Sequence, residues 1–201
     1  MRGTRISYLI DHPEFIPQLA QWLFEHWGTI LGEKTVEARI EKLKTHLNQD
    51  KLPIAWVAHA KGQLFGTAAL RVHDLEGRED LTPWLGGVFV GPDVRHQGIG
   101  TLLCATVANE ARLRGIETLY LFTLDRQAWY ARLGWELLGP CVWHKRRGDI
   151  LSKKLHIPRR PCSRPSTLLM PIGFMLALEF KVFGRSGPFR WAVCTARKQG
   201  D

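Results

Sequence analysis

The sequence predicts an α/β fold in which helices flank a mixed central sheet. A glycine-rich turn joins a strand-like run to an amphipathic segment, and a second strand-like run follows it. Earlier in the chain, two runs rich in strand-favouring residues flank a Lys-Gly pair. The first pattern is typical of a β-α-β unit with parallel strands, and the second is typical of an antiparallel hairpin. A sheet that contains both kinds of pair is mixed.

The elements before the glycine-rich turn follow from periodicity and from turn residues. Pro13 marks the start of a helix, because proline is favoured in the first helical turn, and apolar residues continue to Trp27. Lys61 and Gly62 suit a hairpin turn. We therefore expect, in order, a strand at residues 6–10, the helix from Pro13, a helix at 36–47, and strands at 54–60 and 64–72.

The glycine-rich turn at residues 95–100 predicts an anion site. It reads Arg-His-Gln-Gly-Ile-Gly and comes shortly after the apolar run 88–90. The first N–H groups of a helix lack intrahelical partners, and the helix dipole adds positive partial charge there. Gly98 and Gly100 let the backbone approach an anion closely. We expect the anion to be a phosphate.

The chain after the turn is predicted to form a helix, a strand and then shorter elements. Apolar residues recur every four positions from Ile99 to Ala111, and Gly115 ends the pattern where a helix-terminating glycine is usual. The run at residues 118–123 is rich in strand-favouring residues. The later elements are a short helix around Tyr130 and strands near residues 135–138 and 149–155.

Two common classes of phosphate-binding turn are excluded by the residues around the glycines. A nucleoside-triphosphate loop ends in Gly-Lys-Ser/Thr, but here Gly100 is followed directly by Thr101. A dinucleotide fingerprint needs a third glycine, but Leu103 stands at that position. The turn therefore belongs to neither class.

The spacing of the turn resembles R/Q-x-x-G-x-G/A, the pyrophosphate signature of the GNAT superfamily of acyl-CoA-dependent N-acyltransferases. A second segment, Ala-Trp-Tyr-Ala-Arg-Leu-Gly-Trp at residues 128–135, resembles that superfamily's aromatic-Tyr-x-x-x-Gly-aromatic segment. Residues 80–90, Asp-Leu-Thr-Pro-Trp-Leu-Gly-Gly-Val-Phe-Val, are similar to a group of small bacterial acetyltransferases. The resemblance covers roughly residues 5 to 156.

The resemblance implies a GNAT-like fold with a mostly antiparallel sheet and a binding site for acetyl-CoA. In that family, main-chain groups of the strand at residues 88–90 pair with the pantetheine arm, and backbone N–H groups of the turn surround the pyrophosphate. The implied acetyl-CoA contacts are Val88, Phe89, Val90, Arg95, His96, Gln97, Gly98, Ile99, Gly100 and Thr101. Arg95 would add a charge-assisted donor.

Acyl transfer to an amine sets out which groups the site needs. The acceptor nitrogen must lose a proton, the thioester oxygen needs a donor, and the departing thiolate needs a proton. A backbone N–H of the strand at residues 88–90 suits the oxygen. Tyr130 matches the superfamily's tyrosine and is the expected acid for the thiolate, the alternative being a role in core packing. The expected reaction is direct attack of a primary amine on acetyl-CoA.

The general base is less clear, because the sequence departs from the family there. Many relatives carry a glutamate on the cofactor strand, whereas this chain has Gly86 and Gly87. A loop side chain or an ordered water must then take the role. Asp80 and Asp74 are the candidates, although a carboxylate in a polar loop is more often simply solvated. Trp84 is a candidate for an acceptor pocket, with core packing as the alternative.

Charge and cysteine usage complete the expectations. The chain has a net charge of +9, and residues 158–201 hold eight Lys/Arg against two Asp/Glu. We expect an acetyltransferase domain at residues 1–156 and a basic, partly apolar tail of unknown role at 157–201. No secretory signal is visible in the first ten residues, and the widely spaced cysteines favour a reduced, cytoplasmic protein without a metal site.

The expected partners are a small amine or a peptide N-terminus as acceptor. A membrane span and a nucleic-acid partner are not expected, and a homodimer is left open. An alternative function is a non-catalytic module on the same fold, which senses CoA or contacts nucleic acid through the basic tail.

Overall fold

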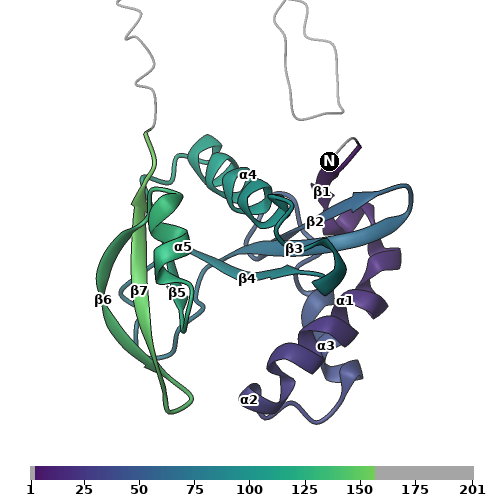
Figure 1. Ribbon diagram of the computed structural model, residues 1–201, viewed down its shortest axis with the longest axis horizontal. Helices are drawn as coiled ribbons and strands as arrows, with labels where there is room; N and C mark the ends of the chain where they lie inside the picture. Colours follow the sequence, from purple (N-terminus) through teal and green to yellow (C-terminus); the bar gives the residue numbers. More distant parts are fainter. Residues whose placement is uncertain (1–2, 157–201) are drawn as a thin grey trace, which may run out of the picture. The chain divides into compact units, whose positions relative to one another are not determined.

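The computed structural model describes residues 3–156 (Figure 1). The predicted tail at residues 157–201 lies outside the described residues. No helix within residues 3–156 is both long and apolar enough to cross a membrane.

The described chain is organised around one seven-stranded sheet with the strand order β1-β2-β3-β4-β5-β7-β6. Every neighbouring pair is antiparallel except β4 with β5, which is parallel. The predicted mixed, mostly antiparallel sheet is therefore confirmed. The strands are β1 (Arg5–Tyr8), β2 (Ile54–Ala60), β3 (Gln63–Arg71), β4 (Trp84–Val90), β5 (Thr118–Thr123), β6 (Glu136–Trp143) and β7 (Arg146–Lys154).

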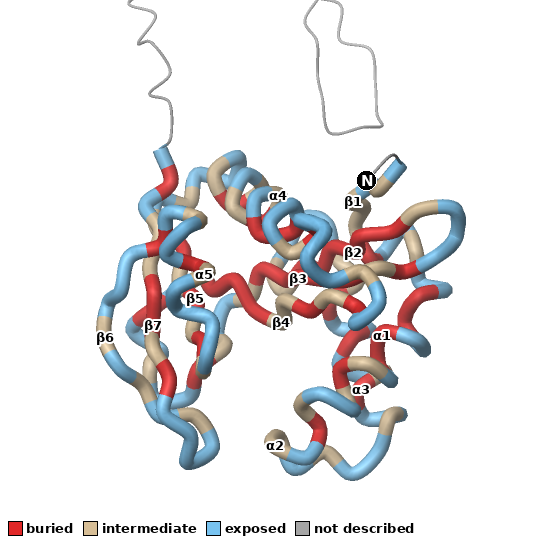
Figure 2. The backbone as a smooth tube through the Cα atoms, viewed as in Figure 1, coloured by how far each residue is buried: buried red, intermediate tan, exposed pale blue. Residues whose placement is uncertain are grey.

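The helices cover both faces of the sheet, as Figure 1 shows for α4 on one side and α1 and α3 on the other. They are α1 (Ile16–Leu23), α2 (Thr29–Leu31), α3 (Val36–Lys44), α4 (Ile99–Leu113) and α5 (Gln127–Arg132). Successive side chains of a strand point to opposite faces. In β2, Trp56 accordingly packs in the core that α4 and α5 share, whereas Val57 packs against α1 and α3. Figure 2 shows the resulting continuous burial along β2 and β3.

The first predicted helix is interrupted, and this differs from the sequence-based expectation. A 3-10 turn at Pro13–Phe15 precedes α1, and a π-helical turn at Phe24–Gly28 connects α1 to α2. The ring of Phe24 packs against Gly28, where a Cβ would come within 2.7 Å of that ring. The wider turn thus depends on a contact that helical periodicity does not report.

Strand β4 contains a bulge, and beyond it the strand diverges from β5. Between the pairs Thr67–Phe89 and Ala69–Gly86, β4 carries one residue more than β3, and Gly87 has a φ of +60°. A bulge bends and twists the strand that contains it. Strand β4 pairs with β5 only at Trp84 and Tyr120. Within the described residues, the later part of this edge of β4 therefore has no strand partner (Figure 1).

The C-terminal hairpin is longer than predicted. Strands β6 and β7 pair from Glu136–Ser152 to Trp143–Arg146, and His144 and Lys145 form the turn between them with φ values of 45° and 63°. Two positive φ angles are typical of the hairpin turn that best fits strand twist. His-Lys is not a usual sequence for such a turn, so the turn was not recognised from the sequence. The two strands of the hairpin were therefore predicted to be shorter than they are.

Candidate functional site

The predicted phosphate turn has a backbone conformation suited to an anion. A 3-10 turn at Pro92–Val94 follows β4, and α4 begins at Ile99. His96 and Gly98 both adopt left-handed conformations, with φ values of 61° and 78°. Alternation of this kind turns successive N–H groups toward a common point, and the dipole of the 15-residue helix adds to it. The turn therefore presents a concave set of N–H donors.

The two sequence motifs lie next to each other in the structure. A Cβ on Gly100 would be 3.4 Å from the Trp129 ring and 3.6 Å from the Val90 side chain. Trp129 in turn makes an edge contact with the Tyr130 ring, with 4.7 Å between the ring centroids. The start of α4, the end of β4 and helix α5 therefore meet at Gly100.

Arg95 is exposed, and its guanidinium is held against the end of β4. Its Nε donates a hydrogen bond of 3.1 Å to the Val90 carbonyl, and its guanidinium carbon lies 5.9 Å from the centre of the Phe89 ring. Phe89 is buried in the core on the α1 and α3 side, whereas Val88 and Val90 pack against the other core. One donor of Arg95 is thus committed to the strand that precedes the phosphate turn.

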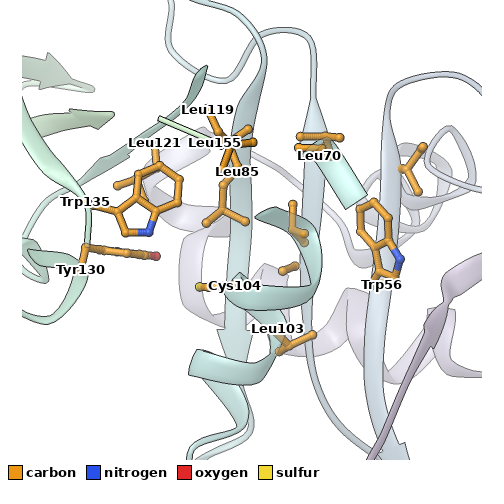
Figure 3. Close-up of a cluster of buried hydrophobic side chains, with 14 of the residues drawn as sticks. Trp56, Leu70, Leu85, Leu103, Cys104, Leu119, Leu121, Tyr130, Trp135 and Leu155 are labelled. Carbon is orange, nitrogen blue, oxygen red and sulfur yellow. The ribbon is translucent and has the colours of Figure 1, made fainter. Parts of the chain in front are cut away.

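Tyr130 is buried and its hydroxyl makes no hydrogen bond within residues 3–156. Its side chain is 8% exposed, and in Figure 3 the hydroxyl end of its ring points from α5 toward the strand that carries Leu85. Burial raises the pKa of Tyr130 far above its usual value, and the nearby Cys104 and the charge of Asp74 raise it further. The hydroxyl therefore stays protonated and can act as a donor.

Cys104 lies beside Tyr130 in the same core but offers no competing charge. It is 3% exposed, and burial raises the pKa of its thiol to about 12. A thiol of this kind is inert at neutral pH. Cys104 and Cys141 are both free cysteines in the described part of the chain.

Asp74 lies against the bulge of β4. A Cβ on Gly86 would be 2.4 Å from the Asp74 Oδ2 atom, and a Cβ on Gly87 would be 2.8 Å from the Arg71 Nη2 atom. Arg71 Nη1 donates to Asp74 Oδ1 in an ion pair whose side chains are 20% and 12% exposed. The two glycines thus leave the space that this ion pair fills. Arg71 is a site residue that the sequence interpretation missed, although a basic residue three positions before a candidate carboxylate was a usable signal.

The two other predicted site residues, Asp80 and Trp84, do not join Asp74 and Arg71 at the β4 bulge. Asp80 is largely exposed and forms an ion pair of 2.9 Å with Arg78, whose hydrogen bond lowers the pKa of Asp80. Trp84 is 0% exposed, and its indole N–H donates a 2.7 Å hydrogen bond to the Leu81 carbonyl. A fully buried ring has no surface to offer an acceptor, so we assign Trp84 to the core and to the support of the loop at residues 72–83.

A cavity of about 400 Å³ lies between that loop and the C-terminal hairpin. Asp74 is one of its lining residues. The other lining residues are Leu75, Glu76, Gly77, Val142, Trp143 and His144. Within residues 3–156, no group of three or more His, Cys, Asp or Glu side chains is arranged to hold a metal ion.

The comparisons with known proteins point to one family. Residues 52–137 match the acetyltransferase (GNAT) domain family. No curated protein matches the chain in sequence.

Three solved structures illustrate the similarity of fold. An aminoglycoside 6'-acetyltransferase type Ii is 24% identical with a TM-score of 0.61, covering 78% of this chain and 99% of its own. An aminoglycoside 6'-N-acetyltransferase in complex with coenzyme A is 22% identical with a TM-score of 0.59, again covering 78% and 99%. The yncA protein of Salmonella typhimurium with its cofactor acetyl-CoA is 16% identical with a TM-score of 0.57, covering 81% and 99%.

At these identities the solved structures establish the fold alone, and the domain match covers residues 52–137, which is less than half of the chain. Both agree with the resemblance inferred from the two motifs. The described chain has the fold of GNAT acetyltransferases, and residues 52–137 are similar in sequence to the acetyltransferase (GNAT) domain.

Proposed function

We propose that this protein transfers an acetyl group from acetyl-CoA to a primary amine by direct attack of the amine on the thioester. The observation that carries the proposal is the convergence at Gly100 of the phosphate turn, the unpaired edge of β4 and the segment that holds Tyr130. We assign the activity to residues 1–156 and place the protein in the cytoplasm.

Acetyl-CoA fits the concave turn and the edge of β4. The N–H groups from His96 to Thr101 surround the pyrophosphate, because the left-handed residues in the turn and the helix dipole both favour an anion there. The edge of β4 at Val88 and Val90 pairs with the pantetheine amides as an added strand would. Gly100 keeps the start of α4 free of a side chain where it approaches Val90 and Trp129, so the backbone there can lie close to the ligand.

Asp74 is the proposed base for the amine. Its carboxylate is held at the β4 bulge by Arg71, next to the strand that would carry the thioester. Asp74 takes one proton from the acceptor ammonium and passes it to solvent, which leaves a neutral nucleophile. We prefer Asp74 to Asp80, because Asp80 is exposed and paired with Arg78.

Tyr130 and a backbone N–H of β4 carry out the remaining steps of the reaction. The amine nitrogen bonds to the thioester carbon while an N–H of β4 near Val88 stabilises the oxyanion. The C–S bond then breaks, Tyr130 donates its hydroxyl proton to the departing thiolate, and the phenolate regains a proton from the acetylated nitrogen. The raised pKa of Tyr130 keeps that proton in place until the thiolate forms.

Two measurements test the proposal. Acetyl-CoA should raise the melting temperature of the purified protein, because a ligand that binds only the folded state stabilises it. Release of CoA should then depend on an added amine. An unchanged melting temperature at millimolar acetyl-CoA would count against acetyl-CoA binding, and binding without turnover on any amine would favour a CoA sensor.

A further inference from the structure

The charged side chains around the β4 bulge indicate which charges an acceptor amine should carry. Five charged side chains come together in this region from the segment between α2 and α3, from α3, from the end of β3 and from the loop after β3. Each is linked to at least one other by an ion pair or by its electrostatic effect. They are Glu33, Arg39, Lys42, Arg71 and Asp74. Three of them are cations and two are anions.

Two of the three cations are paired with the two anions, which leaves one cation without an anionic partner in this group. Arg39 and Glu33 form a buried ion pair of 2.6 Å, with side chains 5% and 14% exposed. Arg71 is paired with Asp74. Lys42 reaches solvent and makes no ion pair within residues 3–156.

The Arg71 guanidinium also has unused donor capacity. It donates to Asp74 through Nη1, whereas its buried Nε has no hydrogen-bond partner within the described residues. Its Nη2 lies over Gly87, where no side chain intervenes. Unmatched donors on a guanidinium favour an incoming carboxylate, because the guanidinium can hold both carboxylate oxygens.

The neighbouring titratable groups indicate that the potential here is positive. Burial lowers the pKa of Lys42, and the charges of Arg71 and Arg39 lower it further. Burial lowers the pKa of His46 to about 4, with Arg71 as the next cause. A further positive charge is therefore unfavourable beside Lys42 and His46, and a negative charge is favoured there.

We propose that the acceptor is an amino acid, or a similar amine that carries a carboxylate beside its amino group. Asp74 receives the ammonium, and Arg71 and Lys42 receive the carboxylate. Adjacent opposite charges on the protein match adjacent opposite charges on a zwitterion, since Arg71 and Asp74 are in direct contact. The inference rests on the proposed function and adds the substrate class.

A polyamine acceptor is the competing possibility. Glu76 lines the cavity beside Asp74 and could receive a second ammonium. Two of the solved structures similar to this chain are named as aminoglycoside acetyltransferases. The positive charge of Lys42, which is left over when Arg39 and Arg71 are paired, disfavours a second ammonium, so acceptor preference separates the two possibilities.

The first experiment compares matched acceptors at saturating acetyl-CoA. Each amino acid is assayed against the amine that lacks only its carboxylate, such as phenylalanine against phenethylamine and lysine against cadaverine, with kanamycin as a polycation. For the pair that contains the best acceptor, we expect kcat/KM to be higher for the amino acid by about tenfold or more, which is roughly 1.4 kcal/mol. Equal values, or a preference for cadaverine or kanamycin, would overturn the inference while leaving the proposed function intact.

The second experiment assigns the preference to Lys42. Lys42→Ala should lower the ratio of the two kcat/KM values by about tenfold. Lys44→Ala is the matched control, because Lys44 lies on the same helix and is paired with Glu41 at 2.7 Å. It should leave the ratio unchanged. Equal ratios in wild type and Lys42→Ala would contradict the role of Lys42, and absence of turnover with every amine would overturn the proposed function itself.

Discussion

The carboxylate of Asp74 occupies the space that a side chain at Gly86 would need. An added Cβ at that position would lie 2.4 Å from Asp74 Oδ2. The Asp74 carboxylate can therefore lie against β4 only because residue 86 has no side chain. Strand β4 carries no glutamate, yet the structure brings a carboxylate to it from the loop.

Gly86→Ala should reduce activity by displacing Asp74. The new methyl group cannot share the space with the carboxylate, so Asp74 and Arg71 must move together. Misplacement of a reacting group by about 1 Å can cost about 100-fold in rate. We expect a fall of about 10- to 100-fold in kcat, measured as CoA release at saturating acetyl-CoA.

Gly139→Ala is the control for this substitution. Gly139 also lies in a strand, and a Cβ there would meet nothing within 4 Å. Its kcat should match that of the wild type. Equal kcat values for the two variants would contradict the placement of Asp74.

Gly98→Ala should weaken acetyl-CoA binding. Gly98 has a φ of +78° at the start of α4, and alanine is strained there by about 1 to 2 kcal/mol. Relief of the strain would turn the N–H groups away from the pyrophosphate. We expect the melting-temperature shift at a fixed acetyl-CoA concentration to fall to less than about half of the wild-type shift.

The other end of α4 provides the matched control. Gly115 also has a φ of +78° with open space around it, so Gly115→Ala carries the same backbone strain. Both variants should lower the melting temperature of the free protein. Only Gly98→Ala should reduce the shift caused by acetyl-CoA, and an equal reduction in Gly115→Ala would show that strain alone explains the loss.

Stability should decrease on acidification because of His46. Burial holds the pKa of His46 at about 4, whereas the unfolded chain has the usual value near 6.5. Between these values the unfolded state binds more protons, so the free energy of unfolding falls as the pH falls from about 6.5 to 4. The expected loss is about 3 kcal/mol.

This loss can be measured by urea unfolding at neutral and acidic pH. His26 and His59 also have lowered pKa values, for which burial is the largest cause, and they contribute in the same direction. His46→Gln should therefore flatten the pH profile without abolishing its slope. A profile as steep as that of the wild type would contradict the assignment to His46.

The sequence predicted those elements whose limits are set by neighbouring residues along the chain. The strands at 54–60 and 118–123 are confirmed to the residue. Strand-favouring residues and a flanking turn fixed their limits without help from distant contacts. The left-handed conformation at Gly98 was predictable for the same reason, because a glycine marks it directly, and phosphate binding at this turn stays a prediction.

The missed features depend on contacts between distant residues. The bulge of β4 needs the Arg71–Asp74 pair above Gly86, and Gly-Gly alone does not report that pair. Trp84 fits an acceptor pocket by residue type, but its hydrogen bond to Leu81 places it in the core. The spacing of residues in the sequence was enough to identify the motifs. Which other side chains lie beside them depends on tertiary packing, which the sequence pattern does not report.

The rate of CoA release by the wild-type protein and by Tyr130→Phe, with the best amine and saturating acetyl-CoA, tests the central claim most directly. Phenylalanine fills the same space but has no proton to give the thiolate. We predict that kcat falls by about 100- to 10,000-fold while the melting-temperature shift with acetyl-CoA is retained. Equal kcat values in the two proteins would contradict the role of Tyr130, and no amine-dependent CoA release by the wild type would contradict the acetyltransferase activity.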